Sequence, residues 1–210
     1  MADRPGLSGL LVDFGGVLTT NVFQSFEAFC EAEGLLPTTV RDRFMKDPRA
    51  RALLADLETG RLTEADFEPR FAAVLELPPE RSPGLIDRLF EGMRPDHAMV
   101  DAVRAARDAG VSTGLVSNSW GAGRYDREAF PALFDAVVIS GEEGVRKPDE
   151  RIYALGADRL GLAPAACVFV DDLPGNLKPA AALGMATVHH VRAEDTIAQL
   201  EELLGVTLRR

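Results

Sequence analysis

Short runs of consecutive apolar residues recur along the chain. The first covers Leu10–Val12 and stops at Asp13, which two glycines follow. Later runs of the same kind cover residues 111–116, 136–139, 166–170 and 186–191. Continuous apolar runs of this length are typical of strands that are buried on both faces. They therefore predict a sheet of parallel strands.

The segments between the later runs have the periodicity and end signals of helices. Gly110 and Gly184 follow two of these segments, as expected for helix C-termini. The predicted helices cover residues 96–109, 149–160, 174–183 and 193–204. Alternation of strands and helices predicts an α/β fold, a Rossmann-like parallel sheet with helices on both faces.

A different pattern occupies residues 22–90, where no strand run interrupts the helical spacing of apolar residues. Phe23, Phe26 and Phe29 share one helix face, and residues 58–62 read as a loop between two helices. This pattern predicts a small all-α helical bundle inserted after the first strand, with its phenylalanines as its own core. We expect the core at residues 1–20 and 95–210 and the bundle at 21–94.

Composition and charge narrow the class of protein. A chain of 210 residues with 46% apolar residues predicts a globular core with a small insertion. The net charge of −10 argues against nucleic acid or an anionic membrane as a partner. No apolar run approaches the roughly 20 residues of a membrane span, and the first nine residues lack a signal-peptide core. We therefore expect a cytoplasmic protein with two reduced thiols, at Cys30 and Cys167.

Polar residues follow the predicted strands at the points where they end. These residues are Asp13 after the first run, Ser117 and Asn118 after the second, Lys147 after the third, and Asp171 and Asp172 after the fourth. The carboxyl ends of parallel strands share one edge of a sheet, which is where ligands bind. A carboxylate, a hydroxyl, a cation and a paired carboxylate are what metal-assisted phosphoryl transfer requires.

The residue types indicate how such chemistry would run. Asp13 and one of Asp171 and Asp172 can hold a hard cation, and Mg²⁺ is the obvious one. Without it, a phosphate and an aspartate 4 Å apart repel by about 4 kcal/mol at an effective dielectric near 20. Ser117 would donate a hydrogen bond to the phosphoryl group, and backbone N–H groups of the turn at Gly16 would help to position it.

Lys147 is unusual for this chain. The only lysines among the 23 basic residues are Lys46, Lys147 and Lys178. A surface cation would therefore almost always be arginine here, so the lysine indicates a need for a compact ammonium group.

Four motifs in order resemble those of the haloacid dehalogenase superfamily. They are Asp13-Phe14-Gly15-Gly16-Val17-Leu18, Ser117-Asn118, Lys147-Pro148, and Asp171-Asp172 with Asn176 beyond. The run from Phe169 to Pro179, with Gly184-Met185, is most similar to the phosphatase-like N-terminal domain of soluble epoxide hydrolases and related bacterial sugar phosphatases. The resemblance covers nearly the whole chain.

The resemblance implies roles for these residues. Asp13 would be a nucleophile that forms an aspartyl-phosphate, with Ser117, Asn118 and Lys147 at the phosphoryl group. Mg²⁺ would be held by Asp13, the carbonyl of Gly15 and Asp172, with Asp171 in support. The inserted helices resemble the family's cap, whose loop, with Glu58 and Arg61, would select substrate. Apart from the resemblance, Trp120 follows Ser117 closely enough to line the pocket, and Arg124 would meet an anionic substrate.

One position departs from the family's pattern. Most phosphatases of the superfamily have a general-acid Asp two residues after the nucleophile, where this chain has Gly15. A missing general acid typically costs about 10²–10⁴-fold in rate. A good leaving group, a proton from elsewhere such as Glu58, or weak turnover would each account for the glycine.

We expect a Mg²⁺-dependent phosphatase that acts on a small phosphorylated metabolite, as a monomer or homodimer. A 2-haloacid dehalogenase is the enzymatic alternative, because that branch shares the nucleophile and lacks the acid. A catalytically weak module that binds a phosphometabolite is the other.

Overall fold

Five parallel strands form one sheet in the order β3-β2-β1-β4-β5. The computed structural model describes residues 6–121 and 125–209. The strands are β1 (Gly9–Val12), β2 (Ser112–Ser117), β3 (Ala136–Ile139), β4 (Cys167–Asp171) and β5 (Ala186–His189). The predicted α/β fold with a parallel sheet is confirmed, and β1 lies at its centre.

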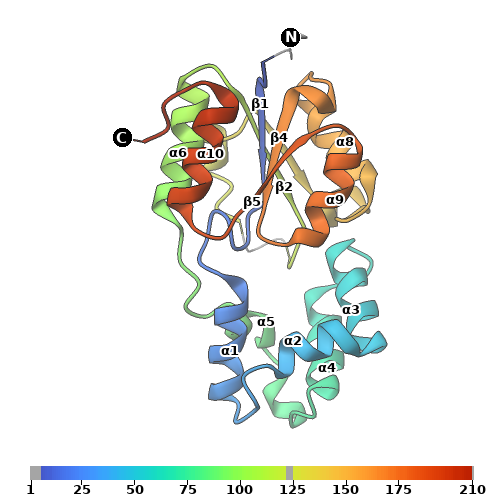
Figure 1. Cartoon of the computed structure of the whole chain (residues 1–210). Coiled ribbons are helices and arrows are strands. Elements are labelled where there is room, and N and C mark those ends of the chain that lie inside the picture. Colours follow the sequence, from blue (N-terminus) through green and yellow to red (C-terminus); the bar gives the residue numbers. More distant parts are fainter. Residues whose placement is uncertain (1–5, 122–124, 210) are drawn as a thin grey trace.

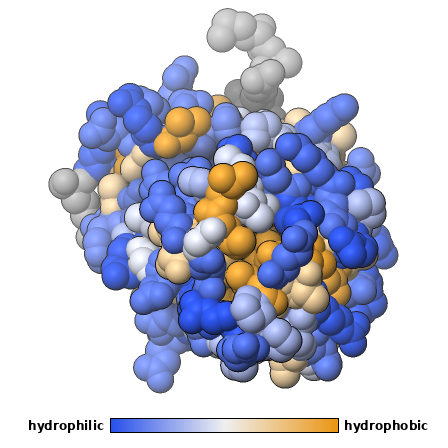
Figure 2. Space-filling view, turned by 90° about the horizontal axis from the view of Figure 1, so that it is seen from below, coloured by the Kyte–Doolittle hydropathy of each residue, from blue (hydrophilic) through white to orange (hydrophobic). Residues whose placement is uncertain are grey.

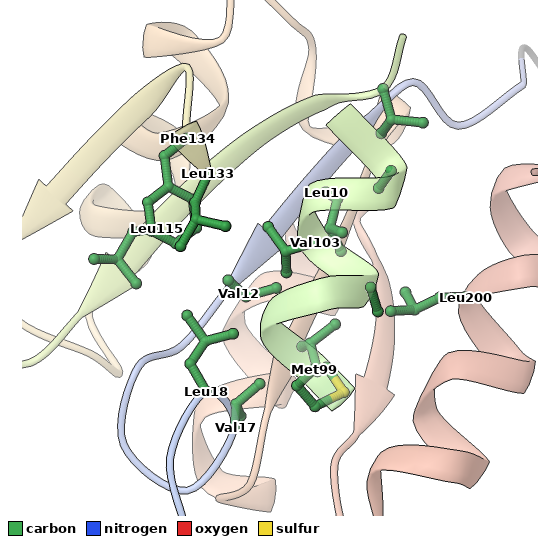
Figure 3. Packing of buried hydrophobic residues seen from close by; sticks show 14 of the residues in the cluster. Leu10, Val12, Val17, Leu18, Met99, Val103, Leu115, Leu133, Phe134 and Leu200 are labelled. Carbon is green, nitrogen blue, oxygen red and sulfur yellow. The ribbon is translucent and has the colours of Figure 1, made fainter. Parts of the chain in front are cut away.

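Helices cover both faces of this sheet (Figure 1). One face carries α6 (His97–Asp108) and α10 (Ala193–Leu204), and the other carries α8 (Glu150–Arg159) and α9 (Pro174–Ala182). Side chains alternate along β1, so Leu10 and Val12 pack toward α6 while Leu11 joins the opposite cluster (Figure 3). This explains why the strand is apolar without interruption. A short helix, α7 (Ser140–Glu143), follows β3.

Five helices between β1 and α6 form a separate bundle, which we call the cap. They are α1 (Val22–Ala32), α2 (Thr39–Lys46), α3 (Pro48–Glu58), α4 (Glu64–Val74) and α5 (Leu85–Leu89). The side chains of Asn21, Asp47 and Thr63 cap the N-termini of α1, α3 and α4. The cap has its own apolar cluster and lies beyond the carboxyl edge of the sheet (Figure 1).

The two segments that join cap and core run antiparallel to each other. The backbone N–H of Thr20 donates to the carbonyl of Arg94 over 2.8 Å, and that of Asp96 donates to Leu18 over 2.9 Å. The cap is therefore connected through a paired crossing, and it touches the core again where α3 meets α7.

Two predicted boundaries differ from the structure. Glu58 is the last residue of α3 and not the start of the loop, because the helix continues until the Thr59 hydroxyl bonds back to the carbonyl of Ala55 over 2.6 Å. The strand predicted at 186–191 ends at His189. Among the described residues, no helix combines the length and apolar character needed to cross a membrane.

Candidate active site

The carboxyl edge of the sheet brings the predicted polar residues together. Asp13 directly follows β1, and its backbone N–H donates to Val170 of β4 over 2.9 Å. Ser117 and Asp171 are the last residues of β2 and β4. Asp13, Asp171 and Asp172 can each offer a carboxylate oxygen within 4.8 Å of the others. The cluster is thus a consequence of parallel strands that end level with one another.

Lys147 is the cation at the centre of this cluster. Its Nζ lies 2.8 Å from Oδ1 of Asp13 and 2.7 Å from Oδ2 of Asp171. The side chain is almost completely buried. The two carboxylates raise its pKa against the opposing effect of burial, so Lys147 stays charged. An ammonium can donate three hydrogen bonds, which leaves one donor for a substrate.

Asp171 is fully occupied by protein partners. Its Oδ1 accepts from the backbone N–H of Leu173 (2.8 Å) and from Nδ2 of Asn176 (3.0 Å), while Oδ2 holds Lys147. No part of the residue is exposed. The geometry therefore suits Asp171 to orienting Lys147.

Asp13 and Asp172 have the free coordination capacity. One oxygen of Asp13 holds Lys147, and within the described residues its other oxygen and the carboxylate of Asp172 form no ion pair. Burial raises the pKa of Asp13 to about 7 despite Lys147, and burial with the charge of Asp171 raises that of Asp172 to about 6. Negative charge therefore exceeds what one lysine neutralises, and these carboxylate oxygens fit a hard divalent cation such as Mg²⁺.

Gly16 lies against the side chain of Asp172. Its N–H donates to Oγ1 of Thr19 over 3.1 Å and is not available to a phosphoryl group. Its φ is +75°, and a Cβ there would lie 2.3 Å from Oδ2 of Asp172. The absence of a side chain at Gly16 therefore makes room for the carboxylate of Asp172.

Ser117 has a partner that the sequence did not reveal. The hydroxyl of Tyr125 lies 3.0 Å from Oγ of Ser117, and both residues are buried beside the pocket. Burial raises the pKa of Tyr125 to about 12. Eight residues and a change of direction separate the two, so no periodic pattern marks the pair.

Asn118 uses both ends of its amide on the backbone of Lys147. Its Oδ1 accepts from the Lys147 N–H over 2.8 Å, and its Nδ2 donates to the Lys147 carbonyl over 3.2 Å. Asn118 lines the pocket, but these bonds show that it also holds the lysine loop against β2.

A pocket of about 330 Å³ opens above the cluster, between core and cap. The floor of the pocket is polar and is formed by Asp13, Ser117, Asn118, Lys147 and Asp172. Its roof is mainly apolar and is formed by Val22, Phe23, Phe26, Phe44, Leu54, Phe90, Met93 and Trp120. Trp120 packs against Phe90 and Phe44 with ring centroids 5.1 and 5.6 Å apart. The phenylalanines belong to the cap's own apolar cluster, as predicted, and Phe23, Phe26, Phe44 and Phe90 also line the pocket. Figure 2, viewed from the cap end, shows apolar side chains framed by hydrophilic ones.

The two predicted cap residues have different surroundings. Glu58 is buried in the pocket, with its Oε2 2.8 Å from Nε of Arg146. Arg61 instead points to solvent and pairs with Asp56 over 2.9 Å, because it follows the turn that ends α3. The prediction that Arg61 contacts substrate is not supported by this placement. Arg146, which the sequence analysis did not select, lines the pocket, and Arg124 lies outside the described residues.

A parallel α/β core with a carboxylate cluster and a buried lysine at one edge of its sheet, beneath a helical cap, indicates a hydrolase. The chain belongs to the haloacid dehalogenase-like hydrolases, a family that its sequence matches over residues 7–184. The family resemblance found in the sequence is therefore confirmed.

Several curated proteins are similar to this chain. It is 40% identical to acyl-CoA dehydrogenase family member 10 of Mus musculus over 52% of the chain and 10% of that protein. It is 28% identical to bifunctional epoxide hydrolase 2 of Sus scrofa over 96% of the chain and 40% of that protein. It is 27% identical to a sesquiterpene phosphatase of Aspergillus oryzae over 70% of the chain and 77% of that protein. The chain thus spans less than half of the first two relatives.

Solved structures share the fold. A haloacid dehalogenase family enzyme of Bacteroides thetaiotaomicron, in complex with magnesium and inorganic phosphate, aligns with a TM-score of 0.63 at 20% identity, over 89% of this chain and 95% of that one. L-2-haloacid dehalogenase of Xanthobacter autotrophicus aligns with a TM-score of 0.61 at 20% identity, over 97% and 85% of the two chains. At these identities the likeness establishes the fold and not the reaction.

Proposed function

We propose that this protein is a Mg²⁺-dependent phosphomonoesterase that uses Asp13 as its nucleophile. The observation that carries the proposal is the arrangement of Asp13, which has one oxygen on Lys147 and the other free beside Asp172. A carboxylate held in this way cannot rotate away from the pocket, and the adjacent aspartate offers a second oxygen to a cation.

Each polar group of the floor has a task in this reaction. Asp13, Asp172 and the Gly15 carbonyl would hold Mg²⁺, which would supply the positive charge that neutralises the phosphate. An oxygen of the Asp13 carboxylate attacks phosphorus, the bond to the leaving oxygen breaks, and an aspartyl-phosphate forms. Ser117 and Lys147 donate hydrogen bonds to the phosphoryl oxygens as negative charge develops on them. Water then attacks phosphorus, which releases phosphate and the Asp13 carboxylate.

The charges of the floor favour phosphoryl transfer over dehalogenation. Dehalogenation needs no metal, and it would leave Asp172 ionised beside Asp13 and Asp171 with only Lys147 as counter-charge. Phosphoryl transfer with a divalent cation balances these charges. Chloride release from 2-chloropropionate in the presence of EDTA would support the dehalogenase instead.

The roof indicates what kind of ester the enzyme accepts. Aromatic and aliphatic side chains make up most of the lining above the floor, beside Arg41, Glu58 and Arg146, so an alcohol with an apolar body fits better than a free sugar. The similarity to a sesquiterpene phosphatase supports this choice. We therefore specify the predicted small metabolite as a phosphomonoester of an apolar alcohol.

A substrate panel with metal control tests the proposal. Purified protein is assayed with p-nitrophenyl phosphate, acetyl phosphate, a sugar 1-phosphate and an isoprenyl monophosphate, with Mg²⁺ or EDTA. We expect phosphate release that depends on Mg²⁺. The rate enhancement over the uncatalysed reaction should be largest for the apolar ester. Absence of metal-dependent release from every ester contradicts the proposal. Tight binding without turnover, measured by calorimetry, would instead favour a binding module. The observation that supports such a module is Gly15, which stands where most phosphatases of the family have a general acid.

A further inference from the structure

Glu58 is the one carboxyl that the cap contributes to the pocket within the described part of the chain. Its position is set by the core, because the Ser140 hydroxyl donates to the Glu58 carbonyl. Ser140 is itself held by the backbone N–H of Ser119 over 2.8 Å. A Cβ at Gly60 would lie 2.5 Å from the carbonyl of Gly141, so the chain beyond Glu58 also lies directly against the core.

The Glu58 carboxyl is buried and incompletely satisfied. Nε of Arg146 lies 2.8 Å from Oε2, but its N–H is directed at the carbonyl of Lys147, 3.1 Å away. Among the described residues Oε2 consequently accepts no hydrogen bond, although Glu58 is only 5% exposed. A buried carboxyl oxygen without a donor is costly when ionised, whereas a protonated one carries an O–H that needs an acceptor.

The environment of this carboxyl keeps a proton available near neutral pH. Burial raises the pKa of Glu58 to about 7, while the charges of Arg146 and Lys147 act in the opposite direction. A general acid is most effective when its pKa lies near the working pH. An ordinary exposed glutamate, with a pKa of about 4.3, would rarely hold the proton at neutral pH.

The other groups of the pocket are poorly suited to this role. Lys147 is committed to two carboxylates, and the hydroxyl of Tyr125 is engaged by Ser117 with a pKa of about 12. Gly15 has no side chain that could donate a proton. The cap lies close to it, because a Cβ there would lie 3.1 Å from Cγ2 of Val22. The proton must therefore come from another element or from solvent.

We propose that Glu58 donates the proton to the leaving alcohol, so that a cap residue replaces the general acid missing at Gly15. The inference rests on the proposed phosphatase function. As Asp13 bonds to phosphorus, the P–O bond to the leaving group breaks and its electron pair stays on oxygen. That oxygen takes the proton of Glu58, giving the free alcohol, the Glu58 carboxylate and the aspartyl-phosphate. The carboxylate then takes a proton from the attacking water.

A series of leaving groups tests this role. The variant E58Q keeps the size and burial of the side chain but cannot transfer a proton as a carboxyl does. We expect its kcat/KM to fall by about 10²–10⁴-fold for the phosphate of an aliphatic alcohol. For p-nitrophenyl phosphate, whose leaving group departs unprotonated, we expect little change. E58D should restore part of the loss.

The pH profile gives an independent readout. In the wild type, the ratio of kcat/KM for the aliphatic ester to that for p-nitrophenyl phosphate should fall as pH rises through about 7, because Glu58 loses its proton. Ionisation of the nucleophile and of bound metal ligands affects both substrates and largely cancels in the ratio. In E58Q the ratio should be low and independent of pH.

The matched control is E33Q. Glu33 is a cap glutamate whose side chain is shielded by Arg81 (2.6 Å) and Arg88 (3.0 Å), and it does not line the pocket. This variant should keep the wild-type ratio of the two substrates.

Three results would overturn the role of Glu58. They are an equal loss on both substrates in E58Q, full activity of E58Q on the aliphatic ester, and a pH-independent ratio in the wild type. In each case Mg²⁺-dependent release by the wild type leaves the phosphatase function intact. If the wild type itself hydrolyses no ester, the phosphatase function and this inference fall together.

Discussion

The floor and the roof of the pocket are built on different principles. On the floor, Lys147 joins Asp13 and Asp171 through contacts of 2.7–2.8 Å, and each group is held by at least one further bond or by a strand end. The roof has no such network. It consists mainly of aromatic side chains from α1, α2 and the loop around Trp120, which contact one another through ring edges and faces.

This difference separates two functions. Directed hydrogen bonds and buried charges tolerate little displacement, as expected where bonds are made and broken. Apolar contacts are undirected and depend mainly on the area that is covered, so the roof can accept different bodies of similar size. Glu58 belongs to neither class, since it comes from the cap yet places a titratable carboxyl beside the floor.

Replacing the proposed nucleophile, Asp13, should have the largest effect on activity. D13N retains the shape of the floor but cannot attack phosphorus as a carboxylate, so we expect a loss of about 10⁴-fold or more in kcat on every ester. Phosphate release with saturating Mg²⁺ measures it. D149N, at the exposed N-cap of α8, is the control and should retain activity. Full activity of D13N would refute the assignment of the floor.

Removing the central cation should have the largest effect on stability. In K147M, Asp13 and Asp171 remain buried without their counter-charge, which typically costs about 3–5 kcal/mol. Urea unfolding monitored by circular dichroism measures the loss, and D171N combined with K147M should recover part of it. Substitution of the exposed Arg49, which pairs with Asp47, should leave stability unchanged. If K147M is as stable as the wild type, the floor is not held by this cation.

Truncating the roof should change selectivity and leave the chemistry intact. W120A removes the ring that contacts Phe26, Phe44, Phe67 and Phe90. We expect kcat/KM for an isoprenyl phosphate to fall by roughly 10–100-fold, in line with about 1.5–3 kcal/mol for a large buried side chain. For acetyl phosphate, which does not reach the roof, kcat should stay close to the wild-type value. An equal loss on both esters would show that the roof supports the floor.

Proton binding by the carboxylates of the floor should have a smaller, pH-dependent effect on the stability of the protein. Folding raises the pKa of Asp13 from 3.8 to about 7 and that of Asp172 from 3.8 to about 6. Protons therefore bind more tightly to the folded state, and this stabilisation is present below about pH 4 and is lost as pH rises to about 7. The Tm of the Mg²⁺-free protein should accordingly fall across this window, apart from the opposing contributions of exposed carboxylates.

Metal should counteract that loss, because Mg²⁺ binds the ionised carboxylates. The gain in Tm on adding Mg²⁺ should thus be larger at about pH 8 than at about pH 5.5, by a few degrees, and should be much reduced in D172N. Differential scanning fluorimetry with Mg²⁺ or EDTA gives the comparison. A gain that is independent of pH would argue against metal binding at Asp13 and Asp172.

Much of the core was predictable because its signals are local. The apolar run before Asp13 is buried on both faces, and a strand of that kind is recognisable without knowledge of its neighbours. Parallel order then places the ends of β1, β2 and β4 along one edge, which brings Asp13, Ser117 and Asp171 together. For these residues, sequence position alone implied spatial proximity.

The sequence predicted the helices of the cap but not the surface that they present to the pocket. Helical periodicity shows which residues share a face, yet not whether that face meets another helix or a ligand. The side chains of Phe26 and Phe44 contact each other and also line the pocket, so one apolar stripe serves both purposes. Arg61 was misplaced for a related reason, since a loop's sequence does not reveal the direction of its side chains.

The sequence by itself determined the sheet, its polar edge and the family, because each depends on short apolar runs and on residue types at their ends. Only the tertiary structure decided how the acidic pair divides its work. Asp171 turns inward to Lys147 and Asn176, whereas Asp172 lies beside Gly16 and forms no ion pair within the described part of the chain. It also decided that Glu58, far from Arg146 along the chain, is buried against it. Such contacts arise from packing between separate elements, and the burial that shifts the pKa of Glu58 exists only once cap and core have met.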